Sequence, residues 1–283
     1  MKRLLIFCHG WRYLMKARVL TCYFLLAICT SICYSQSTTD KSKITVYLRS
    51  GVTQQTTTDH LLNYYDYSGK TMIPLNLDVF YFNKQHLFVL NLLHESATLY
   101  PDNTHNNYYE YNYIHHRATE LKLEYFYTVA KDNGYISAHA GISNNSHIVV
   151  QEENYKSLLS NSAEGYRKSY DLSALSMSPA LLVNIHIQKS TLLLKGACSL
   201  LNLATRPDDD FVKQLGLANT FHWKWYSPTE YKSVFFSAMY QYQIAHGLGF
   251  TAEFNVLYRT YSTDDYQYLR HSFLIGISKT FQR

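Results

Sequence analysis

The last fifty residues alternate apolar and polar side chains with a period of two, and no other feature constrains the fold as strongly. Between 234 and 244 every even position is apolar, and the pattern returns over 248–258 and 273–281. A strand turns successive side chains to opposite faces, so each of these segments has one apolar and one mainly polar face. Consecutive strands of membrane-crossing length, with charges on the polar face, predict an antiparallel transmembrane β-barrel of the outer membrane.

The same test finds strand candidates further upstream. They cover 44–48, 73–81, 86–96, 121–129, 136–142, 175–187 and 192–200.

The connections between these segments fall into two size classes. Short turns are predicted at 83–84, 131–134, 189 and 246–247, and long polar connections at 52–71, 98–118, 144–170 and 203–231. Outer-membrane barrels join their strands by short periplasmic turns and longer outward loops. The alternation of the two classes gives ten strands with both termini in the periplasm.

One segment disturbs this count. Residues 215–225 also alternate, and if they cross the membrane an even number of strands requires one more, around 147–155. The sequence therefore predicts an all-β fold of ten to twelve strands, in a single domain covering 36–283.

Residues 1–35 have the composition of a cleaved signal peptide. Lys16 and Arg18 precede an apolar run over 19–28, and small residues at 33 and 35 suit cleavage before Gln36, with Met15 as an alternative start. A retained membrane anchor is the alternative, and the short run interrupted by Thr and Cys argues against it.

This leader also carries the excess charge. Five of the 26 basic residues and none of the 21 acidic residues precede Gln36, so the remaining chain is balanced. Basicity therefore gives no argument for nucleic-acid binding. Four of the five cysteines lie in the leader as well, which leaves Cys198 alone and excludes a disulfide framework.

The C-terminal segment 273–281, with the sequence FLIGISKTF, resembles the strand that outer-membrane barrels present to their assembly machinery, although Gln282 and Arg283 extend beyond the usual terminal aromatic residue. The Tyr34-Ser35-Gln36 junction and the Tyr-rich loops are similar to those of exported barrels of the Bacteroidota type. The resemblance covers 36–283 at the level of the class and names no subfamily. It implies location in the outer membrane, with membrane lipids and the assembly machinery as partners.

If the apolar face meets lipid, the polar face lines the interior. Its charged and histidine positions are Arg49, Asp78, Glu95, Glu120, Lys122, Glu124, His139, His186, Lys195, Glu253, Arg259 and Arg270. Charges in a low-dielectric enclosure must be paired or hydrated. We expect a salt-bridge network that fills a narrow barrel. The alternative is a pore or cavity for a small solute, and the mixed signs favour neither anions nor cations.

A lipid-modifying hydrolase is the alternative with the most specific chemistry, because it needs a nucleophile, a base and an acid in one place. The available pieces are His271, Ser272, Glu253, Ser237 and the run 94–96. Adjacent strand residues point to opposite faces, so His271 is not expected to activate Ser272. We expect no catalytic group.

Histidines give a weak case for metal. His115 and His116 are predicted to lie in a Tyr- and Asn-rich loop near His105, and their spacing matches no structural zinc site. We expect neither a metal nor a cofactor. The sequence favours a non-enzymatic barrel that is a narrow channel, a ligand-binding barrel or a structural and surface-interaction protein. The alternatives are the hydrolase and a secreted soluble β-barrel binding protein.

Overall fold

The computed structural model describes residues 42–59, 66–101, 113–132, 135–155, 166–207, 221–261 and 266–282. These belong to one compact unit, Lys41–Arg283. The predicted signal peptide lies outside the described residues.

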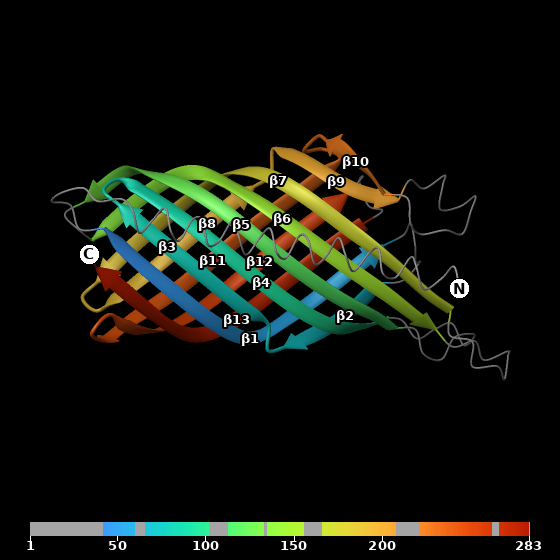
Figure 1. Ribbon diagram of the computed structural model, residues 1–283, viewed down its shortest axis with the longest axis horizontal. Coiled ribbons are helices and arrows are strands. Elements are labelled where there is room, and N and C mark those ends of the chain that lie inside the picture. The colour runs from blue at the N-terminus through green and yellow to red at the C-terminus, as the bar shows by residue number, and fades with distance from the viewer. Residues whose placement is uncertain are drawn as a thin grey trace, which may run out of the picture. The chain divides into compact units, whose positions relative to one another are not determined.

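Thirteen antiparallel strands form one closed sheet (Figure 1). They are β1 Lys43–Asp59, β2 Asp66–Met72, β3 Leu75–Asn83, β4 His86–Pro101, β5 Tyr113–Asp132, β6 Ile136–Tyr155, β7 Tyr166–Ile187, β8 Ser190–Cys198, β9 Leu201–Pro207, β10 Phe221–Tyr226, β11 Tyr231–Ala245, β12 Leu248–Tyr261 and β13 Tyr266–Gln282. The first strand pairs with the last along the whole length of both, which closes the barrel. Among the described residues, no helix is long and apolar enough to cross a membrane.

The thirteen strands occupy ten positions around the wall, because three positions hold an interrupted strand. Strands β2 and β3 both pair with β1 and β4, and β8 and β9 both pair with β7. The turn 227–230 separates β10 from β11. Strand β10 pairs with β9, and β11 pairs with β8. The segment 221–226 is therefore the outer part of the β11 position, and 147–155 belongs to β6. Both segments form strand but neither adds a position to the wall, so the lower count of ten holds.

The interruption between β2 and β3 is a β-bulge. Residues 71–74 lie opposite only 95–97 of β4. Ile73 has a φ of 69°, which is strained for a β-branched residue, and Pro74 cannot donate to the ladder. The predicted strand 73–81 therefore begins two residues late, at Leu75.

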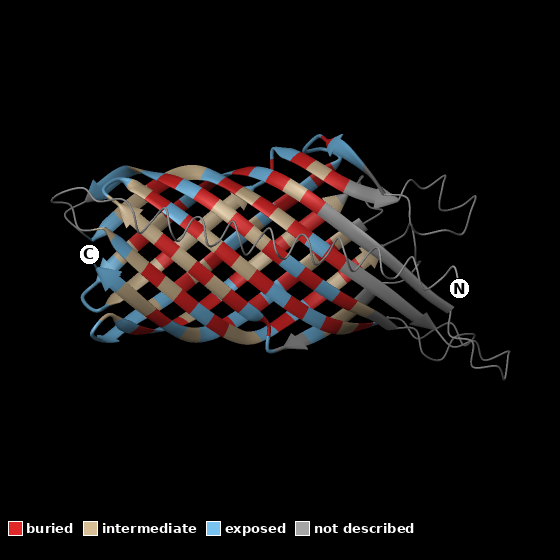
Figure 2. Ribbon diagram, viewed as in Figure 1, coloured by how far each residue is buried: buried red, intermediate tan, exposed pale blue. Residues whose placement is uncertain are grey.

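Burial alternates along most of the described wall, so Figure 2 shows a chequered pattern. At least 32 large apolar side chains are exposed, including Leu48, Phe88, Leu181, Phe254 and Ile277. A soluble protein rarely exposes more than a few hundred Å² of continuous apolar surface. An exterior of this kind suits lipid rather than water.

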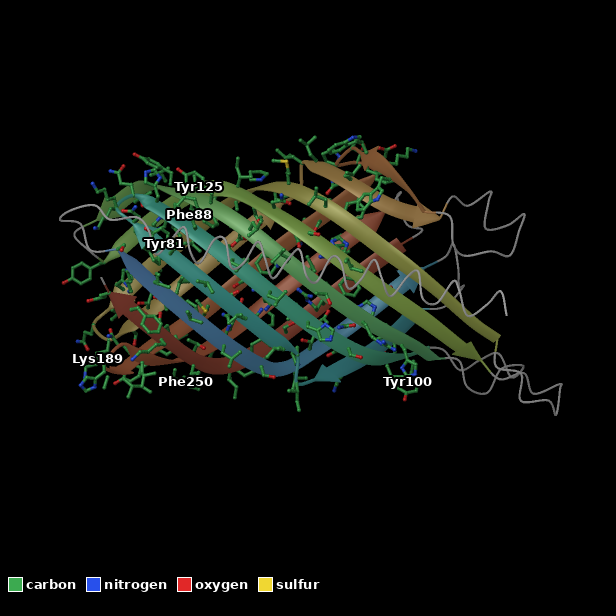
Figure 3. All side chains as sticks on the ribbon, in the orientation of Figure 1. Tyr81, Phe88, Tyr100, Tyr125, Lys189 and Phe250 are labelled. Carbon is green, nitrogen blue, oxygen red and sulfur yellow. The ribbon has the colours of Figure 1, made fainter. Side chains whose placement is uncertain are left out.

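Aromatic side chains line up on the outer wall toward the end with the short turns. Tyr81, Phe88 and Tyr125 lie on neighbouring strands (Figure 3), with ring centroids 6.2 Å apart for the first pair and 5.1 Å apart for the second. Such rows are typical of a membrane–water interface.

The strands extend further than predicted into segments that were assigned to loops. Strand β1 reaches Asp59 and β4 reaches Pro101, while β5, β6 and β7 have 20, 20 and 22 residues. Their outer parts are mainly polar but keep buried apolar residues such as Leu99 and Val149, so regular apolar alternation is lost although backbone pairing continues. The expected connections 52–71, 98–118, 144–170 and 203–231 are correspondingly shorter.

Gly276 makes the closing pair of strands possible. It lies opposite Arg49, and a Cβ atom there would be 2.7 Å from both Cα and Cγ of Arg49. Gly196 lies on β8, where a Cβ atom would meet nothing within 4 Å.

We expect Gly276→Val to destabilise the barrel by about 1–3 kcal/mol or more, since the added side chain overpacks the seam, the contact between β1 and β13 that closes the barrel. Gly196→Val is the matched control and should leave stability unchanged. The measurement is the faster migration of the unboiled protein in SDS gels, followed against temperature. Equal loss of the fast form in both variants would show that the seam has no special need of glycine.

Candidate functional site

The interior nearest the short turns is filled by an apolar cluster, here called the apolar plug. It consists of Tyr47, Phe80, Leu87, Val89, Phe126, Ala180, Leu182, Leu193 and Met239. These residues come from β1, β3, β4, β5, β7, β8 and β11, which lie on different sides of the wall. The plug therefore extends across the barrel.

Next to the plug lies a charged group centred on Arg49, the Arg49 cluster. The guanidinium of Arg49 forms ion pairs with Asp78 on β3 and Glu253 on β12, and donates to Asn76 Oδ1 at 2.8 Å. Ser237 Oγ donates to Glu253 Oε1 at 2.7 Å. One cation from the seam thus binds acids from two other strands.

A second charged group, the Glu120 cluster, lies further toward the long connections. The Glu120 carboxylate lies 2.7 Å from Arg259, 3.2 Å from Arg270 and 3.7 Å from Lys122. Arg270 also contacts Glu95 at 3.2 Å. All five side chains are buried, so each charge depends on its partners rather than on water.

Neighbouring side chains complete this layer. Tyr268 donates its hydroxyl hydrogen to Glu95 Oε1 at 3.0 Å. Glu124 binds Lys195 at 2.9 Å and accepts from Ser143 at 2.9 Å. The Lys122 ammonium lies 3.7 Å from the centroid of the Phe235 ring.

The interior residues expected from the sequence take these positions. Ten of the twelve belong to ion pairs: Arg49, Asp78, Glu95, Glu120, Lys122, Glu124, Lys195, Glu253, Arg259 and Arg270. His139 is buried and hydrogen-bonded to Thr128 and Asn184. Lys195 is half-buried, and His186 is exposed near the short turns.

The placement of His115 and His116 in a loop is wrong. Both lie within β5, and His116 is buried and stacked on Tyr268 with the ring centroids 5.5 Å apart. His147 is also buried and hydrogen-bonds to Tyr231 at 3.3 Å. Extending the alternation backward from Glu120 would have put His116 on the interior face.

Two further outcomes concern metal binding. His105 lies outside the described residues. Within the described ranges, no group of three or more His, Cys, Asp and Glu side chains could hold a metal ion.

The side chains considered for a hydrolase do not lie together in one site. His271 lies on the outer wall with its ring stacked on Phe254, at a centroid distance of 6.5 Å, whereas Ser272 is buried and bonded to Thr53. Ser237 binds Glu253 in the interior. The adjacent residues of the run 94–96 also separate, since His94 and Ser96 face outward while Glu95 faces inward.

No protein-family model and no curated protein matches the sequence. Solved structures are similar in architecture. The outer membrane protease OmpT from Escherichia coli has 11% identity and a TM-score of 0.49, over 88% of this chain and 99% of its own. The β domain of the Bordetella autotransporter BrkA has 10% identity and a TM-score of 0.40, over 85% and 99%. Neisserial surface protein A has 7% identity and a TM-score of 0.36, over 86% and 100%.

The fold class follows from this chain's own geometry. A closed antiparallel sheet with an apolar exterior satisfies its backbone internally and presents hydrocarbon outward, as the bilayer requires. The protein is a transmembrane β-barrel with the architecture of the outer membrane.

We expect Glu120→Gln to lower the free energy of unfolding by about 3–5 kcal/mol, because it leaves Arg259 and Arg270 with too little negative charge. Unfolding by guanidinium chloride in lipid vesicles, followed by Trp fluorescence, measures this change. The control is Glu230→Gln in the exposed turn 227–230, where the amide oxygen can still accept the two hydrogen bonds from Ser227 and the effect should stay within about 1 kcal/mol. A Glu120 variant as stable as this control would contradict the role given to the cluster.

Proposed function

We propose that this protein is a non-enzymatic outer-membrane barrel with a closed interior, which serves as a structural platform for interactions at the cell surface. The observation that carries the proposal is the apolar plug. Side chains from seven strands meet inside the barrel, whereas a porin keeps a polar, water-filled channel. A hydrated solute would have to displace tightly packed apolar groups to pass.

The charged layer supports the same proposal. In a selective channel, charges on the wall face water and attract a permeating ion. Here the Arg49 and Glu120 clusters consist of buried side chains that bind one another. An ion that entered this layer would compete with partners already in contact, so the layer acts as a second barrier.

The lengths of the strands point to the cell surface as the place of action. A membrane-crossing strand needs about 9–11 residues, and β5, β6 and β7 have 20 to 22. Their excess lies toward the long connections, which outer-membrane barrels direct outward. The connection 102–112 carries Tyr108, Tyr109 and Tyr111, and this sequence suits a role in contact with other surfaces.

The finer parts of the proposal rest on the sequence alone. They are the cleaved signal peptide over 1–35, the single barrel domain over 36–283, the Bacteroidota type, and contact of the C-terminal strand with the assembly machinery. No observation favours the lipid hydrolase.

Planar-bilayer recording of the folded, full-length protein tests the closed interior. We expect no stepwise conductance, and no swelling of liposomes in isotonic arabinose, under conditions in which an open porin gives both. Faster migration of the unboiled sample establishes that the barrel is folded. Steady conductance from such a folded sample would overturn the closed interior and favour a channel.

A further inference from the structure

A polar cup opens at the end of the barrel that carries the short turns. Its volume is about 460 Å³, within the range of about 300–1,000 Å³ that is typical of ligand sites. Among the described residues that line it are two lysines, Lys43 and Lys189, and four glutamines, Gln188, Gln241, Gln243 and Gln282. They come from the two ends of the chain's sheet, β1 and β13, and from the hairpins β7–β8 and β11–β12. Figure 3 labels Lys189 at this end.

The cup is basic. Lys43 and Lys189 line it, and none of its described lining residues is an Asp or Glu. Lys84 and Lys131 lie in neighbouring turns at the same end of the barrel but do not line the cup. Two positive charges with no acid among the described lining residues give the cup a positive potential, so it attracts anions.

The floor of the cup is built and closed. Tyr47 donates its hydroxyl hydrogen to Gln241 Oε1 at 3.1 Å, while Gln241 Nε2 donates to Ser278 Oγ at 2.9 Å. Thr280 is held by Thr45 at 3.1 Å. Tyr47 is also a member of the apolar plug, so the floor rests directly on the plug. With the interior closed as in the proposed function, a ligand that enters from this end can only be held or released.

We propose that this cup binds a small organic anion from the periplasm. Its carboxylate or phosphate groups contact Lys43 and Lys189, and its neutral polar groups face the four glutamine amides. A charge-assisted hydrogen bond is stronger than a neutral one, so the two lysines supply most of the affinity. The periplasmic source of the ligand rests on the orientation given by the proposed function, whereas the chemistry of the cup does not.

Isothermal titration calorimetry of the full-length barrel in a zwitterionic detergent tests this proposal. The probes are citrate and inorganic phosphate, with glucose as the neutral comparison. We expect an anion to bind and glucose not to bind. The variant K43Q/K189Q should weaken binding by about tenfold or more. The matched control K84Q/K131Q removes the same charge from the same end outside the cup, and should change affinity by no more than about twofold.

The outcomes are distinct. Stronger binding of citrate assigns the cup to carboxylates, and stronger binding of phosphate assigns it to phosphate esters. Equal weakening of anion binding in both double variants would show that the overall charge of this end attracts the anion, and would overturn the proposal. Binding of glucose with an affinity like that of the anions would overturn it too. A heat-modifiable, non-conducting barrel that binds neither anion would overturn the cup and leave the proposed function standing. Conductance together with anion binding that depends on Lys43 and Lys189 would overturn the proposed function and leave the cup standing.

Discussion

Every backbone N–H and C=O group in a bilayer needs a partner within the protein, and the rest of this structure depends on meeting that constraint. The seam between β1 and β13 meets it by pairing all 17 residues of each strand. Closure then separates an outer wall from an interior, and side chains are assigned to one or the other by the period of two. Gly276 illustrates the cost of a close seam, since only a residue without Cβ leaves room for Arg49 to turn inward.

The charged interior gives the closed sheet its register. A slip of one residue in β1 would carry Arg49 from the interior to the lipid face. In the native pairing Arg49 binds acids on β3 and β12, and Glu120 on β5 binds arginines on β12 and β13. Buried ion pairs add little net stability over apolar packing, whereas one partner without the other is strongly destabilising. With Glu95 on β4 bound to Arg270, the clusters select one alignment of six strands, and the apolar plug lies beside them.

Much of this architecture could be predicted from alternation, and its failures have physical causes. Strands β11 to β13 have one apolar face and one mainly polar face, so their positions and the charged interior face were predicted. The plug was not, because Leu87 and Leu182 lie in strands with apolar residues on both faces, which hides the inward set. The bulge at Ile73 and the polar outer parts of β5 to β7 interrupt the pattern without ending the wall. Which charges meet depends on the stagger of strands around the barrel, which a single sequence does not reveal.

The alternation of β12 between lipid and interior is the most direct test of this account. In a background that lacks the five native cysteines, single spin labels would replace Ala252, Phe254 and Val256 on the outer face, and Thr251 and Asn255 on the inner face. Collision rates with oxygen, which concentrates in lipid, and with an aqueous nickel chelate would then be compared in vesicles. The account predicts high oxygen and low nickel accessibility at the outer three positions, and low values of both at the inner two. Outer positions that collide mainly with the nickel chelate would contradict a membrane-spanning wall.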